Sequence, residues 1–141
     1  MEISHVRKRV LETMEYAKKS AAERRVRTDQ AGREYEVFLE RVAIPLFRQV
    51  ANVLRAEGYT FTVFTPGGSV RLTSDRAAED YVEIALDTAG DQPRVIGHSS
   101  RARGRRVLES ERPIAERTPA ELTEEDVIAF LLKELEPFVE R

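Results

Sequence analysis

Residues 59–73 read YTFTVFTPGGSVRLT, and this stretch decides the fold. Tyr59–Thr65 is rich in aromatic and β-branched residues and follows the period of a β-strand rather than that of a helix. Pro66-Gly67-Gly68 is a turn signal, and Ser69–Thr73 returns as a second strand. The stretch therefore predicts a β-hairpin at the point where helical sequence gives way to strands.

Three further strands are expected after this hairpin. Val82, Ile84 and Leu86 alternate within 80–87, and 93–100 and 105–112 read as the fourth and fifth strands. Every connection is short, whereas parallel strands need a crossover of a dozen or more residues. We therefore expect residues 59–112 to form an antiparallel meander of four or five strands.

The sequence before Tyr59 is helical. Residues 1–30 carry a narrow apolar stripe at spacings of three and four, and 31–58 carry a wide apolar face. We expect a break or bend at Thr28–Gly32, because Gly32 weakens a helix, and a kink or a restart near Val42–Ile44 ahead of Pro45. Gly58 is expected to end this core helix.

The sequence after the sheet predicts a C-terminal helix over 118–139. Thr118-Pro119 is a helix start, Thr123–Asp126 resembles a capping box, and Pro137 is expected to disturb the last turn after about Leu135. Helices at both ends should cover one face of the sheet. The prediction is one α+β domain over 1–141, with two layers in which the antiparallel meander packs on the N-terminal and C-terminal helices.

Composition narrows the class of protein. The chain has 141 residues and no cysteine, and it shows neither a secretory signal nor the ~18–20 apolar residues of a membrane span. We expect a cytoplasmic protein that does not bind membranes. Charge is segregated: residues 1–30 hold 8 basic and 5 acidic groups, 94–112 hold 6 and 2, and 113–141 hold 3 and 8. Such segregation favours complementary faces or a local anion site.

The length of the N-terminal helix is a second clue. A helix over residues 4–30 would measure ~40 Å, while a globule of this size should be only about 37 Å across. The helix must therefore pack on a second subunit, fold back as a hairpin or remain an exposed arm. We expect homodimerisation through the stripe, with these residues at the interface: Val6, Val10, Met14, Ala17 and Ala21.

No catalytic, metal or cofactor site is expected. His5 lies in a charged helix, and His98 neighbours Ser99 on a strand, where adjacent side chains point to opposite faces. The acids near Asp126 suit the N-terminal turn of a helix better than a metal.

One basic segment is the exception to this lack of candidate sites. Its residues are expected to gather at one end of the hairpin between strands four and five: Arg94, His98, Arg101, Arg103, Arg105 and Arg106. Guanidinium groups bind phosphate or carboxylate well, but no aromatic residue lies in 93–112 to stack on bases. The segment therefore either pairs with the acidic C-terminal helix or binds an anion, and nucleic acid is possible but not favoured.

Three functions remain, in order of preference. The first is a non-enzymatic homodimeric interaction module, chaperone-like or adaptor-like, with a protein partner. The second is nucleic-acid or phosphorylated-ligand binding through the hairpin of Arg94–Arg106. The third is an enzyme using carboxylates and arginines in a cleft between sheet and helices, which would need a deep polar pocket.

Overall fold

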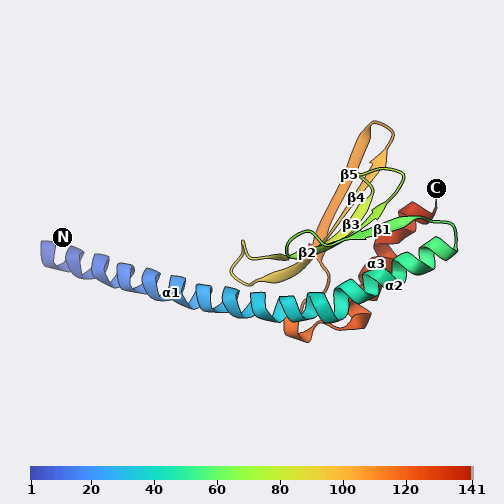
Figure 1. The fold of residues 1–141 in the computed structure, drawn as a ribbon. Coiled ribbons are helices and arrows are strands. Elements are labelled where there is room, and N and C mark those ends of the chain that lie inside the picture. The colour runs from blue at the N-terminus through green and yellow to red at the C-terminus, as the bar shows by residue number, and fades with distance from the viewer. Residues whose placement is uncertain (141) are drawn as a thin grey trace.

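The computed structural model describes residues 1–140; Arg141, the last residue of the expected domain, lies outside them. The chain runs from helices into a sheet and back to a helix (Figure 1). The elements are α1 (Ile3–Phe38), the π-helical turn η1 (Leu39–Ala43), α2 (Ile44–Ala56), β1 (Phe61–Phe64), β2 (Ser69–Ser74), β3 (Tyr81–Asp87), β4 (Arg94–Arg103), β5 (Arg106–Pro113), the 3₁₀ turn η2 (Pro119–Glu121) and α3 (Glu124–Val139).

The sheet is the expected meander. Its five strands lie in the order β1-β2-β3-β4-β5, and every neighbouring pair is antiparallel. The predicted α+β class is confirmed, with five strands rather than four. β4 continues to Arg103 instead of ending at Ser100, because Arg101 and Ala102 pair with Leu108 and Val107.

One face of the sheet carries the core. α2 contacts β1 and β2, and α3 contacts β3 and β4. The side chains between the two layers are fully buried, and they include Phe47, Val70, Leu72, Val82, Ile84, Val127 and Leu131. The helices and the sheet thus form the expected two layers. Burial of the apolar side chains between them supplies the hydrophobic free energy of folding.

Gly97 on β4 seats α3 on the sheet. A Cβ atom at Gly97 would lie 2.2 Å from ring atoms of Phe130, so only glycine leaves room for that ring. The guanidinium of Arg112 stacks over the same Phe130 ring, 4.9 Å from its centre. The Nε atom of Arg112 donates a hydrogen bond to the Glu134 carboxylate at 3.1 Å. The contact therefore combines close packing with a charged hydrogen bond.

The expected break at Thr28–Gly32 is wrong, because α1 is continuous from Ile3 to Phe38. Glycine inside a helix costs only about 1 kcal/mol relative to alanine. Ala31 and Tyr35 are buried on either side of Gly32, and their packing offsets that cost. The expected interruption near Val42–Ile44 takes the form of a restart, since η1 inserts a π-helical turn and α2 begins at Ile44, just before Pro45. Gly58 follows the end of α2 with φ 91°.

The expected C-terminal helix over 118–139 is interrupted near its start: Pro119–Glu121 form the 3₁₀ turn η2, Leu122 is extended and buried, and α3 begins only at Glu124. Thr123 accepts a hydrogen bond from the Asp126 amide and completes a capping box. A second box precedes it, where hydrogen bonds from Thr118 hold the pKa of Glu121 below its usual value. The expected end at Leu135 is wrong: Pro137 removes one backbone donor, but buried Phe138 packs edge-on against Phe61 and α3 continues to Val139.

Candidate functional site

Residues 1–27 form the part of the chain that we call the arm. α1 extends away from the domain along this length (Figure 1), and Ala31 is the first buried residue of the chain. Val6, Val10 and Met14 are each 43–51% exposed, and the predicted stripe is therefore uncovered in a single chain.

The stripe follows the same side of α1 as the core contacts do. Val10 precedes Ala31 by 21 residues, and Met14 precedes Tyr35 by the same number. Twenty-one residues turn an α-helix to within about 60° of the starting direction. The stripe therefore looks toward the side on which the domain sits, beyond the reach of that domain.

The arm also presents a hollow in its surface. The hollow is lined by Met1, Val6, Arg9, Val10, Thr13 and Met14. Four of these residues follow the i, i+3, i+4, i+7 spacing that forms a hole in coiled-coil packing. The surface has the shape that receives one side chain from a facing helix.

An apolar groove lies between α2 and α3 on the side away from the sheet. Its volume is about 480 Å³, and it is lined by Gln49, Val50, Val53, Leu54, Ile128, Leu132, Leu135, Glu136 and Val139. Val53 is 65% exposed and Leu132 is 58% exposed. In the sequence, Val50, Val53 and Leu54 are visible only as part of the wide apolar face of residues 31–58. That face is wider than packing against the sheet alone requires, and this excess width is the sequence signal for the groove.

The basic hairpin brings only part of the predicted cluster together. Gly104 and Arg105 form a two-residue turn with φ 63° at Gly104, and Arg103 pairs with Arg106 across it. Arg94 lies at the other end of β4, beside Asp87, and His98 lies in the middle of that strand. The expectation of one cluster is corrected, because an extended strand of this length separates its ends by about 30 Å.

The tip of this hairpin (Arg101, Arg103, Arg105 and Arg106) is not neutralised by α3. Within residues 1–140, none of its four guanidinium groups lies within 4 Å of a carboxylate. Glu140 lines a shallow hollow with Arg101 and Arg103 but forms no ion pair with them. Pairing of the tip with the acidic helix in the same chain is therefore not observed, and the tip is a concentrated positive charge.

His98 belongs to a polar ladder on the outer face of the sheet. Its imidazole meets the Tyr81 ring edge-on at 5.5 Å and lies 3.8 Å from a carboxylate oxygen of Glu109. Ser99 points to the opposite face and shares a hydrogen bond with Ser110. The alternation of the strand separates the Ser–His pair as predicted.

Arg71 belongs to this outer face, whereas Tyr35 is buried in the core on α1. Arg71 pairs with Glu83 at 3.0 Å and stacks over Tyr81 at 3.9 Å. The hydroxyl of Tyr35 donates to the Gly68 carbonyl at 2.7 Å, and burial together with the negative charge of Glu83 raises the pKa of Tyr35. These contacts tie α1 to the β1–β2 turn.

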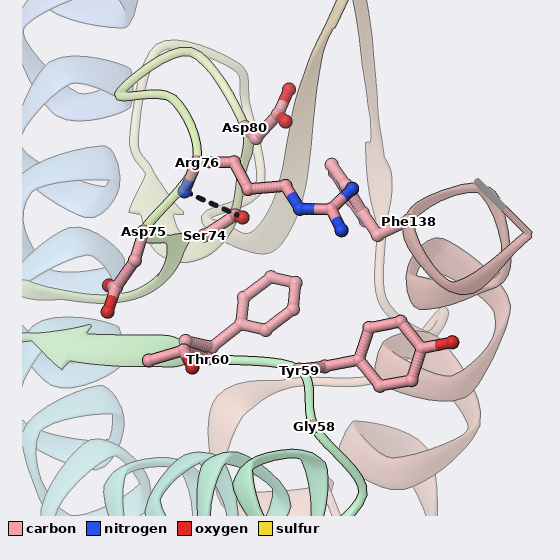
Figure 2. Close-up of a pocket in the computed structure, with 9 residues that line it drawn as sticks. Gly58, Tyr59, Thr60, Ser74, Asp75, Arg76, Asp80 and Phe138 are labelled. Carbon is pink, nitrogen blue, oxygen red and sulfur yellow. Dashed lines mark hydrogen bonds between the residues drawn. The ribbon is translucent and has the colours of Figure 1, made fainter.

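A small cavity of about 220 Å³ opens where β1 starts and α3 ends. Figure 2 shows the guanidinium of Arg76 pointing toward Phe138, above the ring of Tyr59, with Asp75 pointing away. Asp75 accepts a hydrogen bond from Thr62, and the buried carboxylate of Asp80 accepts one from the Ala102 amide at 2.7 Å. The acids of this loop are thus engaged in holding β1 and β4, and sequence reasoning did not find the cavity because its walls come from three distant segments.

Within the part of the chain that the structure describes, no three potential ligand side chains gather as a metal ion would require. None of the helices described combines the length and apolarity needed to cross a bilayer. Comparison with known protein families, curated proteins and solved structures found no match to this chain.

Proposed function

We propose that this chain is a non-enzymatic, homodimeric interaction module of the chaperone or adaptor kind, joined through the arm. One observation carries the proposal: a helix of 36 residues leaves the domain with its apolar stripe exposed. A helix gains most of its stability in water from packing of an amphipathic face. A second copy supplies that packing for Val6, Val10 and Met14.

The absence of cysteine suits a reducing compartment, and we place the module in the cytoplasm. In this proposal the arm joins two copies, while the domain at the end of each arm provides the surfaces for other partners.

Light scattering tests the dimer. The expected mass is twice the 16.1 kDa of one chain. Val10→Glu combined with Met14→Glu places two carboxylates in the interface and should yield a monomer with unchanged circular dichroism of the sheet. Tyr16→Glu is the matched control, because Tyr16 is 75% exposed and lies off the stripe. A monomeric wild-type chain at 100 μM or so would overturn the proposal.

The groove between α2 and α3 is the surface that we assign to a protein partner. Two helices form its walls, which is the shape that receives the apolar face of a third helix. Glu125 and Glu136 lie on the flank of α3 beside it, so a basic amphipathic helix fits best.

A synthetic amphipathic helix of leucine and lysine serves as the probe for this groove. Leu132→Glu should weaken its binding by at least about tenfold, because a carboxylate would replace an apolar contact. Val107→Glu is the control, since Val107 is exposed on β5 and does not line the groove. Equal affinities for both variants would show that the groove is not the binding surface.

Anion binding by the hairpin tip is a second candidate. It is favoured by four arginines within six residues that have no carboxylate partner in the described chain. A phosphate-bearing ligand would neutralise them with bidentate hydrogen bonds. Arg103, Arg105 and Arg106 are exposed and therefore accessible to such a ligand.

A labelled single-stranded oligonucleotide and, separately, inorganic phosphate test this candidate. Arg103, Arg105 and Arg106 are changed together to glutamate, and the salt slope of oligonucleotide binding should fall by about 2. Arg24, Arg25 and Arg27, changed in the same way on α1, make a control of equal charge. Loss of binding in both triple variants alike would point to net charge and not to the tip.

A further inference from the structure

The stripe of the arm and the core contacts of α1 share one side of the helix, and this restricts how two arms can pair. Beyond Thr28 that side is occupied by the chain's own domain, with Ala31 and Tyr35 buried against it. In a parallel pair, the second helix would run into this space at the same end as the first domain. An antiparallel pair avoids the collision because the two domains lie at opposite ends.

The sizes of the side chains along the stripe point the same way. Large residues occupy its first half and alanines its second half, at Ala17 and Ala21. A parallel pair sets each alanine against its own copy and leaves gaps. An antiparallel pair sets large against small, which fills a helix interface at native density.

We infer that two arms pair antiparallel with the two-fold axis near residue 12, an inference that rests on the proposed homodimer. In this register Ile3 lies opposite Ala21, Val6 opposite Ala17, and Val10 opposite Met14. The hollow between Val6 and Thr13 is centred near Val10 and then faces Met14 of the second arm, so it receives a long, flexible side chain.

The register also agrees with the point at which the arm ends and the domain begins. Pairing of residues 3–21 covers about 28 Å and ends before Thr28, the half-buried residue that precedes the domain. The Ala31 residues of the two chains are then about 57 Å apart along the common axis. The dimer is a rod with one domain at each end, so its two grooves act as separate sites that bind a divalent partner by avidity.

Single cysteines test the register on a background that contains none. Val6→Cys and Ala17→Cys are expected to form a disulfide-linked dimer when the two variants are mixed and oxidised. Neither should cross-link with itself, because like positions lie about 15–18 Å apart along the axis and a disulfide needs Cα atoms within about 7 Å. Self-linking of Val6→Cys would establish a parallel pair and overturn the inference.

A third variant separates the arm pair from insertion of the arm into the groove. Leu132→Cys lies in the groove, and cross-linking of Val6→Cys to it would overturn the inference while leaving the dimer intact. Spin labels at Glu23→Cys give an independent reading. The antiparallel register expects a separation of about 33 Å along the axis, and a parallel pair expects only about 10 Å. A monomer by light scattering would instead remove the proposed function itself.

Discussion

Val10, Met14 and Ala17 occupy the positions on α1 that Ala31, Tyr35 and Phe38 occupy three heptads later, yet the first three are exposed and the last three are buried. The spacing of the two sets is identical. They differ in what stands opposite: η2 and the core side chains that the sheet contributes cover the later set, and no part of residues 1–140 covers the earlier one. Periodicity identifies an apolar side of a helix, whereas the element that covers it depends on the whole fold.

The size of the side chains explains why the later set holds the domain. Tyr35 and Phe38 pack their rings 6.3 Å apart, and each aromatic side chain buries 150–250 Å² or so. Valine and alanine in the arm offer much less area. The anchored part of α1 is therefore stable in one chain, while the arm needs the area of a second chain.

The largest expected change in the free energy of unfolding comes from truncating Phe38, one of the buried side chains that anchor α1 to the domain. Phe38→Ala should lower the free energy of unfolding by about 3–5 kcal/mol, because it leaves a cavity between α1 and the sheet. Met14→Ala, in the arm, should change it by less than about 0.5 kcal/mol when measured on the monomer. Urea denaturation at low protein concentration compares the two, and a similar loss in both would erase the distinction between arm and anchor.

Hydrogen exchange should show the same contrast along the helix. At low micromolar concentration, amides of residues 5–25 are expected to exchange about 100-fold faster than those of 35–47, because only the latter need the domain to unfold. Protection of the arm should rise with protein concentration, since association protects it by mass action. Protection of the arm that does not depend on concentration would mean that the chain covers its own stripe.

Tyr35→Phe removes the hydroxyl that ties the anchored part to the β1–β2 turn. The loss should be about 1 kcal/mol at neutral pH, the value of one hydrogen bond. Because the folded state raises the pKa of Tyr35, folding holds the proton that the unfolded chain releases above about pH 10. The contribution of Tyr35 to the free energy of unfolding should therefore be complete below about pH 10 and decline above it. The Tyr35→Phe variant should show a smaller fall in the free energy of unfolding over the same alkaline range.

The smallest expected effect lies at the junction between the two halves. Gly32→Ala should stabilise the chain by about 0.5–1 kcal/mol, because the added Cβ meets no atom within 4 Å beyond its chain neighbours and the nearby helix backbone, and alanine favours the helix. Thermal denaturation measures it, with Gly58→Ala as a contrast that should destabilise because Gly58 has φ 91°. Destabilisation by Gly32→Ala would mean that α1 bends at this glycine in solution.

Much of the fold followed from local patterns. The alternation of Val82, Ile84 and Leu86, the short turns at Gly68 and Gly104, and the capping box at Thr123 are local signals, and each predicted its element. Two local signals misled: Gly32 and Pro137 are weak helix formers, but buried neighbours outweigh their cost. Packing free energy exceeds intrinsic propensity at such positions.

The candidate sites were predictable only in part. The exposed stripe and the arginines near Gly104 are contiguous in the sequence and were visible there. The separation of Arg94 from the tip, the groove between α2 and α3, and the cavity beside Arg76 were not, because each depends on strand register or on segments far apart in the chain.

The sequence by itself determined that a strand-forming hairpin follows two helical segments, because residues 59–73 carry their period and turn in adjacent positions. It also determined that the first of these segments, residues 1–30, carries an amphipathic stripe. Only the tertiary structure decided that one side of α1 packs on the domain in its second part and is exposed in the arm. The domain covers that side from Ala31 onward and leaves it open before Thr28, and which atoms cover an apolar surface is a property of the packed chain and not of the periodicity.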